Sequence, residues 1–126
     1  MYIKIDKADQ LFSKYIRTRD NWTCQRCKKN YEDNPGGLHC SHYFGRAKES
    51  TRFDPENCDA LCYGCHQYWG STDREGYRNF KIIQLGDAYW KRLMLRANSF
   101  KKKDRKMEAI IWKKALESLQ KQSFVL

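Results

Sequence analysis

Two Cys-x-x-Cys pairs constrain the fold of this chain more than any other feature of its sequence. Cys24 and Cys27 form the first pair, and Cys62 and Cys65 form the second. The two-residue gap lets both sulfur atoms of a pair reach one ion, and two such pairs supply the tetrahedral thiolate set of structural zinc. A redox-active motif would need one pair alone. The four cysteines therefore predict a structural Zn²⁺, with reduced, buried thiols as the alternative.

The second notable feature is the crowding of histidine and cysteine between residues 39 and 66. All three histidines of the chain, His39, His42 and His66, lie in this segment. Cys40 and Cys58 also lie there but stand outside both pairs. We interpret these two cysteines as buried, inert thiols, with an additional ligand role as the alternative. A zinc ion bound by the two pairs would fix the geometry of everything between them.

Charge and composition indicate the kind of partner. The chain has 126 residues, a formal net charge of +10 and 40% hydrophobic residues, which predicts one globular domain with an anionic partner, and nucleic acid is the usual one. No apolar run approaches the length that spans a membrane, and the charged N-terminus lacks a signal-peptide core. We expect a cytoplasmic protein without a membrane partner, in a reducing environment where paired cysteines bind metal.

Hydrophobic periodicity and turn residues predict a mostly helical chain around a small hairpin. The expected helices cover residues 7–19, 61–70, 72–85, 87–100 and 102–120. Residues 38–44 are predicted to form the first strand of a hairpin. Asp54 is expected to cap a turn that starts at Pro55, Gly70 to end the short helix, and Gly86 and Asp87 to separate the next two helices. The predicted fold class is α+β.

The apolar faces of the later helices come from the same periodicity. In the last helix the predicted face contains Met107, Ile110, Ile111, Leu116 and Leu119. The aromatic residues of the second half are predicted to be core, with base stacking as the alternative; they are Tyr68, Trp69, Tyr77, Tyr89 and Trp90.

Histidine, asparagine and basic residues in one zinc-framed unit suit phosphodiester hydrolysis. That reaction needs a base for water, a divalent ion for the charge on phosphate, and an anchor for DNA. Histidine suits the first role because its pKa lies near neutrality. Histidine nitrogen and carboxylate or amide oxygen can bind the ion.

The order of these residues resembles the HNH, or ββα-metal, nuclease family. The resemblance covers residues 22–69: a Cys-x-x-Cys, a strand histidine, an asparagine shortly before a second Cys-x-x-Cys, and a histidine directly after it. The segments "HCSHYFGR", "TRFDPENCDALC" and "YRNFKIIQLGDAYWKRL" are similar to phage recombination nucleases of the lambda NinG (Rap) type. The resemblance implies one domain over residues 1–126. Within it, a zinc-framed HNH core with an N-terminal helix covers residues 7–70, and a helical extension covers residues 71–126.

The resemblance also implies roles for single residues. His42 matches the general base, and His66 matches the last position, usually a ligand of the catalytic ion. Asn57 matches the middle position, which orients the base or touches the metal. The sequence departs from the family at Ser41, where many members have an aspartate that binds the ion. His39 is the favoured substitute ligand, with Asp54 and Asp59 as the other choices.

Basic residues beside this segment are candidate DNA contacts. Arg46, Lys48 and Arg52 lie between the predicted base and Asn57, where they are predicted to bind phosphates or to form a solvated loop. A denser run of lysine and arginine at residues 101–106 is a second candidate. No segment suggests a helix that reads base sequence.

These features together predict a metal-dependent DNA endonuclease. The expected cofactors are a structural Zn²⁺ and a catalytic divalent ion, Mg²⁺ or Mn²⁺ in the first place and Ni²⁺ or Zn²⁺ in the second. The expected substrate is double-stranded or branched recombination DNA of phage origin, cleaved by a monomer or homodimer in the host cytoplasm. The alternative is a non-catalytic zinc module that binds nucleic acid, and a structural adaptor is a weaker one.

Overall fold

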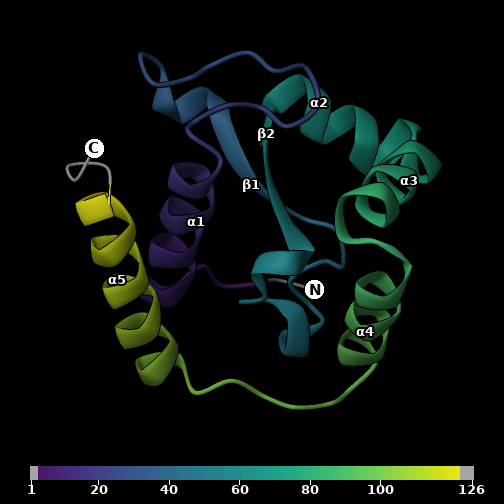
Figure 1. The fold of residues 1–126 in the computed structure, drawn as a ribbon. Coiled ribbons are helices and arrows are strands. Elements are labelled where there is room, and N and C mark those ends of the chain that lie inside the picture. The colour runs from purple at the N-terminus through teal and green to yellow at the C-terminus, as the bar shows by residue number, and fades with distance from the viewer. Residues whose placement is uncertain (1–2, 123–126) are drawn as a thin grey trace.

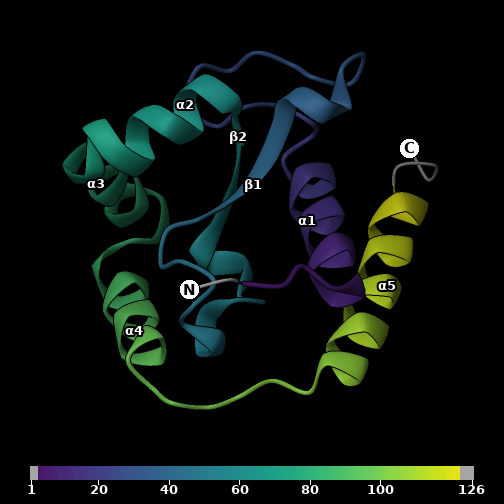
Figure 2. The ribbon, with the colours of Figure 1, turned by 180° about the vertical axis from the view of Figure 1, so that it is seen from behind.

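The computed structural model of the chain describes residues 3–122. Within these residues the chain forms five α-helices and a two-stranded antiparallel sheet. In chain order they are α1 (Lys7–Arg19), β1 (Leu38–His42), β2 (Cys58–Cys62), α2 (Tyr63–Gln67), α3 (Arg74–Leu85), α4 (Asp87–Ala97) and α5 (Arg105–Gln122). α1 and α5 lie side by side on one side of the hairpin, and α3 and α4 lie on the other (Figures 1 and 2). This arrangement confirms the α+β class, and none of the described helices is long and apolar enough to cross a membrane.

The hairpin pairs β1 with β2 so that His42 lies opposite Cys58 and Leu38 lies opposite Cys62. The prediction that a helix starts at residue 61 is wrong, because Leu61 and Cys62 complete the ladder with β1 and α2 begins only at Tyr63. The predicted end at Gly70 is also wrong. The chain continues as a wide helical turn over Tyr68–Thr72, closed by the Asp73 N–H donating to the Tyr68 carbonyl.

Helix α1 has the predicted bounds, and its first turn explains them. Asp6 accepts a hydrogen bond from the Asp9 N–H, and Asp9 accepts one from the Asp6 N–H. This reciprocal capping satisfies two amide groups that a helix start leaves without partners. The apolar face buries Ala8, Phe12 and Ile16 against the hairpin.

Glycine and aspartate fix the other helix ends. Gly86 ends α3 with φ = 83°, a conformation that favours glycine. The prediction that Asp87 caps α4 is wrong, since it is already the first helical residue and its carboxylate pairs with Lys91 at 2.9 Å. The predicted cap at Asp54 is confirmed, because its side chain accepts the Glu56 N–H at the turn that starts at Pro55.

Helix α5 packs on α1 through Trp112, whose ring centroid lies 4.7 Å from that of Phe12. Leu116 is buried beside it, as predicted. Leu119 is half-buried. The other three residues of the predicted face are not in the core: Met107, Ile110 and Ile111 are 52%, 52% and 42% exposed. The prediction fails there because α5 turns its Trp112 side, rather than its isoleucine side, toward α1.

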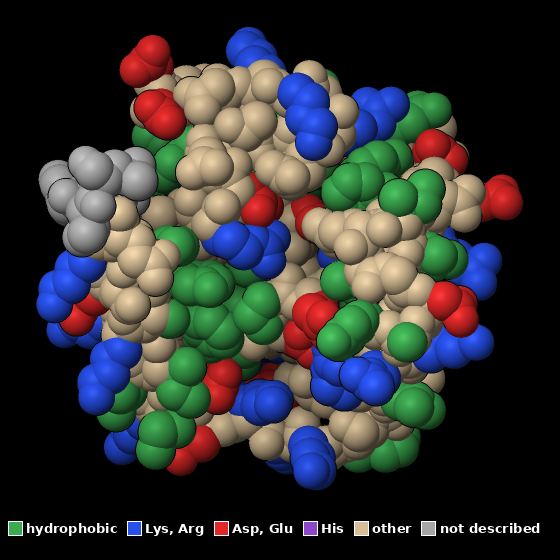
Figure 3. Space-filling model, in the orientation of Figure 1, with side chains coloured by type: hydrophobic (Ala, Val, Ile, Leu, Met, Phe, Trp, Pro, Cys, Tyr) green, Lys and Arg blue, Asp and Glu red, His purple; other side chains and the backbone are tan. Residues whose placement is uncertain are grey.

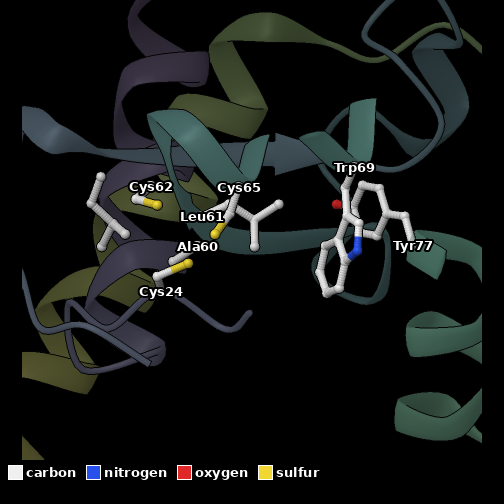
Figure 4. Close-up of a cluster of buried hydrophobic side chains, with 8 residues drawn as sticks. Cys24, Ala60, Leu61, Cys62, Cys65, Trp69 and Tyr77 are labelled. Carbon is white, nitrogen blue, oxygen red and sulfur yellow. The ribbon is translucent and has the colours of Figure 1, made fainter. Parts of the chain in front are cut away.

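Two hydrophobic clusters hold the layers together. One lies under α1 and α5, and the other joins the cysteine pairs to α3 (Figure 4). In the second cluster Trp69 stacks on Tyr77 at 4.9 Å between ring centroids. Trp69, Tyr77 and Trp90 are buried, which confirms them as core, whereas Tyr68 and Tyr89 are 41% and 52% exposed.

Candidate metal centres and active site

The four paired cysteines come together in one group. Cys24 and Cys27 lie in the loop after α1, Cys62 ends β2, and Cys65 lies on α2. Their sulfur atoms all lie within 4.8 Å of one another. The sulfurs of Cys27 and Cys62 are 3.9 Å apart, close to the spacing of about 3.8 Å that a tetrahedral ion with Zn–S bonds of about 2.3 Å imposes. The group therefore fits a structural metal such as Zn²⁺.

The local backbone of the first pair is shaped for such an ion. The Cys27 N–H donates to the Cys24 sulfur at 3.5 Å, and Lys28 adopts a φ of 67° as the chain turns back. Arg26 donates to the Cys65 sulfur at 3.4 Å. N–H donors and a guanidinium around the sulfurs offset part of the negative charge that four thiolates would carry.

One ring nitrogen of His42 forms a hydrogen bond with the backbone, and the other does not take part in that bond. Its Nε2 lies 2.8 Å from the backbone carbonyl oxygen of Arg52. Because a carbonyl only accepts, Nε2 must carry the proton and Nδ1 must carry the lone pair. Burial, with the nearby charge of Arg46, lowers the pKa of His42 to about 4. The imidazole is therefore neutral at neutral pH and can accept a proton through Nδ1.

Asn57 holds the loop that follows His42. Its side chain is fully buried, accepts the Phe44 N–H at 2.9 Å, and donates to the carbonyls of Phe44 and Thr51 at 2.9 and 3.0 Å. Both amide hydrogens are used in these bonds. Of the two roles considered for Asn57, this geometry fits positioning of the loop rather than contact with a metal.

His39 on β1 and His66 on α2 face each other. Their Nδ1 atoms are 3.3 Å apart. Two nitrogens bound to a tetrahedral ion at about 2.0–2.1 Å also lie about 3.3 Å apart. Burial lowers the pKa of His66, and the proximity of His39 and Arg46 lowers it further. The pair can thus offer two ring nitrogens to one divalent ion.

The other candidate ligands point elsewhere. The Ser41 hydroxyl is buried and bonds to the Tyr77 hydroxyl at 2.8 Å. The Asp59 carboxylate is fully buried in a pair with Lys81 at 2.8 Å, and Asp54 pairs with Arg96 at 2.7 Å. All three side chains already have partners, so His39 remains the substitute ligand that the geometry brings to His66.

A pair of adjoining clefts connects these histidines to the surface. One, of about 300 Å³, is lined by Ile3, Ile5, Cys40, His42, Gly45, Arg46 and His66. The other, of about 380 Å³, is lined in part by His39, and it shares Cys40, Arg46 and His66 with the first. The shared residues place all three histidines on one continuous concave surface.

The three predicted phosphate contacts lie in different environments. Arg46 lines both clefts, and its Nε atom is buried without a hydrogen-bond partner. Lys48 is exposed. Arg52 is 5% exposed, and its guanidinium binds both carboxylate oxygens of Asp9 at 2.8 and 2.6 Å. The interpretation of Arg52 as a phosphate contact is therefore corrected, because its charge is paired inside the protein.

Basic residues elsewhere are dispersed. Figure 3 shows lysine and arginine side chains at several places around the viewed face rather than in one patch. Lys101 and Lys102 line a separate cleft with Lys48 and the fully exposed Phe100, whereas Arg105 binds Glu49 and Asp6. The predicted basic run is thus only partly available to an external anion.

Sequence reasoning underestimated one cluster. The ligand atoms of Cys40, His42 and Cys58 lie within 4.8 Å of one another, although the two cysteines belong to neither Cys-x-x-Cys pair. The signal in the sequence was the alternation of Cys40 and His42 on one strand. Recognising Cys58 as their neighbour also required the register of β2.

Comparison with known proteins gives short matches. No protein-family model matches the chain, and no solved structure matches it. A stretch of 61 residues, 48% of the chain, is 34% identical to the histidine–tRNA ligase of Geobacter sulfurreducens and 36% identical to that of Geobacter metallireducens. The chain covers 14% of the length of each ligase. The fold and the cysteine geometry, rather than these matches, define the class of the protein. It is an α+β protein with a four-cysteine group able to hold a structural metal.

Proposed function

We propose that the chain is a metal-dependent DNA endonuclease that hydrolyses phosphodiester bonds by an HNH mechanism. One observation carries the proposal: His42 is neutral, oriented by its Nε2–H bond to the Arg52 carbonyl, and lines the same concave surface as the His39–His66 pair. A base, a pair of metal-binding nitrogens and a cation at Arg46 are the three requirements of phosphodiester hydrolysis.

In this mechanism His42 Nδ1 takes a proton from a water molecule, whose oxygen attacks the phosphorus. The bond from phosphorus to the departing sugar oxygen breaks, and that oxygen takes a proton from solvent. A divalent ion held by His39 and His66 would supply the positive charge that stabilises the transition state, with Mg²⁺ or Mn²⁺ as the first choice and Ni²⁺ or Zn²⁺ as the second. Arg46 contacts the phosphate, and Asn57 positions the loop between base and cation.

The zinc proposed for the four-cysteine group has a structural role, because it would hold α2 and His66 in place. It would join the loop after α1 to the end of β2 and the start of α2, which carries His66. Fixing α2 against the hairpin sets the distance between His66 and His39. The substrate is double-stranded or branched DNA, and phage recombination in the host cytoplasm is the proposed setting, with a monomer or a homodimer as the active form.

A plasmid assay tests this function. Purified protein is incubated with supercoiled plasmid and Mg²⁺, Mn²⁺, Ni²⁺ or Zn²⁺, beside a chelator control and a His42→Ala protein. We expect relaxed or linear product that requires both an ion and His42. A Lys91→Ala protein is the matched control, because Lys91 pairs with Asp87 on the surface of α4.

A non-catalytic zinc module that binds nucleic acid is the second candidate. The observation in its favour is Ser41, whose hydroxyl is buried against Tyr77 and leaves β1 without an acidic ligand at that position. This candidate predicts salt-dependent DNA binding without metal-dependent product on plasmid or on branched DNA. That outcome would overturn the nuclease proposal.

A further inference from the structure

Cys40, His42 and Cys58 have the form of a metal site, and the proposed hydrolysis uses His42 but neither of the two cysteines. Cys40 and His42 are two positions apart on β1, so their side chains share a face of the strand. Cys58 lies directly opposite His42 on β2. The hairpin thus places two thiols and one imidazole around a common point, with one ligand atom of each within 4.8 Å of the others.

These donors are held in place before any ion arrives. The ladder fixes the backbone of all three residues, and α1 covers them with the buried side chains of Phe12 and Ile16. Because the Arg52 carbonyl accepts the proton of Nε2, the free lone pair of His42 is on Nδ1. Binding would therefore require loss of the two thiol protons to solvent and no change of fold.

The cluster is also reachable from outside. Cys58 is fully buried and Cys40 is 6% exposed, which by itself fits two thiols that fill a core. Cys40, however, lines both clefts beside the histidines, and His42 lines one of them. Two of the three ligands, Cys40 and His42, therefore lie at the cleft surface, and Cys58 is buried behind it.

We propose that Cys40, His42 and Cys58 form a second metal site, which takes a thiophilic ion such as Zn²⁺, Cd²⁺ or Cu⁺. Two sulfurs and one imidazole favour such ions over Mg²⁺ or Mn²⁺, which prefer oxygen. The site shares no residue with the four-cysteine group or with the His39–His66 pair. It leaves a fourth position for water or another ligand from the cleft.

Occupation of this site has a consequence that rests on the proposed function. The ion would hold the His42 lone pair that hydrolysis assigns to the attacking water. A thiophilic ion would therefore inhibit cleavage even when Mg²⁺ or Mn²⁺ is saturating. Cleavage activity would then depend on the concentration of thiophilic metal, because His42 is both the general base and a ligand of this site.

Cadmium binding tests the site without any need for cleavage. Protein kept in a reducing buffer is titrated with Cd²⁺, and the ultraviolet charge-transfer band of cadmium–thiolate bonds is measured together with the bound ions by native mass spectrometry. The chain has six cysteines, all free. In wild-type protein we expect the band of six thiolates, and in a Cys40→Ala/Cys58→Ala protein the band of four, with one ion fewer bound.

Two further variants separate the sites and guard against misfolding. His39→Ala is the matched control, because it alters a neighbouring histidine and should leave the thiolate band unchanged. Cys40→Ala alone is the milder variant, and circular dichroism checks that each protein is folded. Equal bands in wild-type and double-variant protein would overturn the proposal, as would a wild-type protein whose only thiolate-bound ion is the one in the four-cysteine group.

A cleavage assay then tests the consequence. In Mg²⁺ or Mn²⁺, added Cd²⁺ should suppress plasmid nicking by wild-type protein at concentrations that leave the Cys40→Ala/Cys58→Ala protein active. Equal inhibition of both would contradict the inhibitory role. A protein that binds the additional ion but never nicks DNA would retain the metal site and reject the nuclease.

Discussion

The buried pair of Asp9 and Arg52 provides a sharp test of how α1 is joined to the loop that holds His42. Arg52 binds both oxygens of Asp9 at 2.8 and 2.6 Å, and the side chains of Arg52 and Asp9 are 5% and 2% exposed. Asp9→Asn keeps the size of the side chain and its part in the cap of α1 but removes the charge. Arg52 would keep its bond to the Lys4 carbonyl and a distant Glu49 carboxylate at 3.7 Å.

Two estimates of the cost agree. Breaking a buried ion pair from one side typically costs about 3–5 kcal/mol, and the remaining partners of Arg52 reduce this to about 2–4 kcal/mol. Independently, burial raises the pKa of Asp9, but hydrogen bonds from Arg52 and Asp6 and the charge of Arg52 lower it to about 2, from an ordinary value of 3.8. That difference corresponds to roughly 2.5 kcal/mol.

The sign of the pH dependence follows from the same pKa. Because the folded pKa of Asp9 lies below the unfolded one, its contribution is fully present above about pH 4. It is lost as the pH falls toward 2. In Asp9→Asn protein this acid-dependent part of the unfolding free energy should be absent, since the side chain no longer titrates.

Urea unfolding followed by tryptophan fluorescence, with zinc saturating, measures the difference. The control is Asp87→Asn, which breaks the pair of Asp87 and Lys91, 75% and 67% exposed and 2.9 Å apart. A pair that is so exposed contributes less than about 0.5 kcal/mol. If Asp9→Asn costs no more than Asp87→Asn at neutral pH, the reasoning about the buried pair is refuted.

Three further predictions concern the zinc group, the base and the DNA contact. Cys62→Ala should abolish zinc binding by the four-cysteine group and unfold the hairpin, measured as metal content and circular dichroism, whereas Cys40→Ala should keep that zinc. The His42 imidazole should be protonated only near its pKa of about 4, as its ring-proton NMR signals report in protein free of the catalytic ion; a titration of His42 near 6.5 would contradict a buried base. Lys48→Ala should weaken DNA binding and reduce the slope of log affinity against log salt by about one, while Lys91→Ala should change neither.

Local patterns in the sequence predicted the elements whose signals are local. Residues 7–19 carry both an apolar stripe and a capping pair, and the helix has those bounds. Gly86 and Asp54 also act within one turn of their own positions. The two Cys-x-x-Cys pairs predicted a metal group because the spacing within each pair is itself the geometric requirement.

The strand β2 could not be predicted in the same way. All five of its residues are buried, so it lacks the alternation of a half-exposed strand. Its charged residue, Asp59, is neutralised by Lys81, which lies 22 positions further along the chain. The prediction for Arg52 failed for the same reason. Its partner Asp9 lies 43 positions away, so the local sequence indicated that Arg52 was an unpaired loop cation available to phosphate. Long-range charge pairs leave no trace in local sequence.

In the candidate site, too, local sequence signals were informative and long-range contacts were not predictable. The order of His42, Asn57 and His66 around the cysteine pairs indicated a nuclease from the sequence, and that function stays a proposal. The proximity of His39 and His66, the tautomer of His42 and the cluster with Cys40 and Cys58 all depend on strand register and loop path, which became clear only in three dimensions.

The most direct test of the account is the rate of plasmid nicking by His42→Ala protein, measured with and without added imidazole at saturating divalent ion. The account predicts that the rate falls by about 10²–10⁴-fold and that imidazole, which can enter the space left in the cleft, restores part of it. Nicking by His42→Ala protein at the wild-type rate without imidazole would contradict the account.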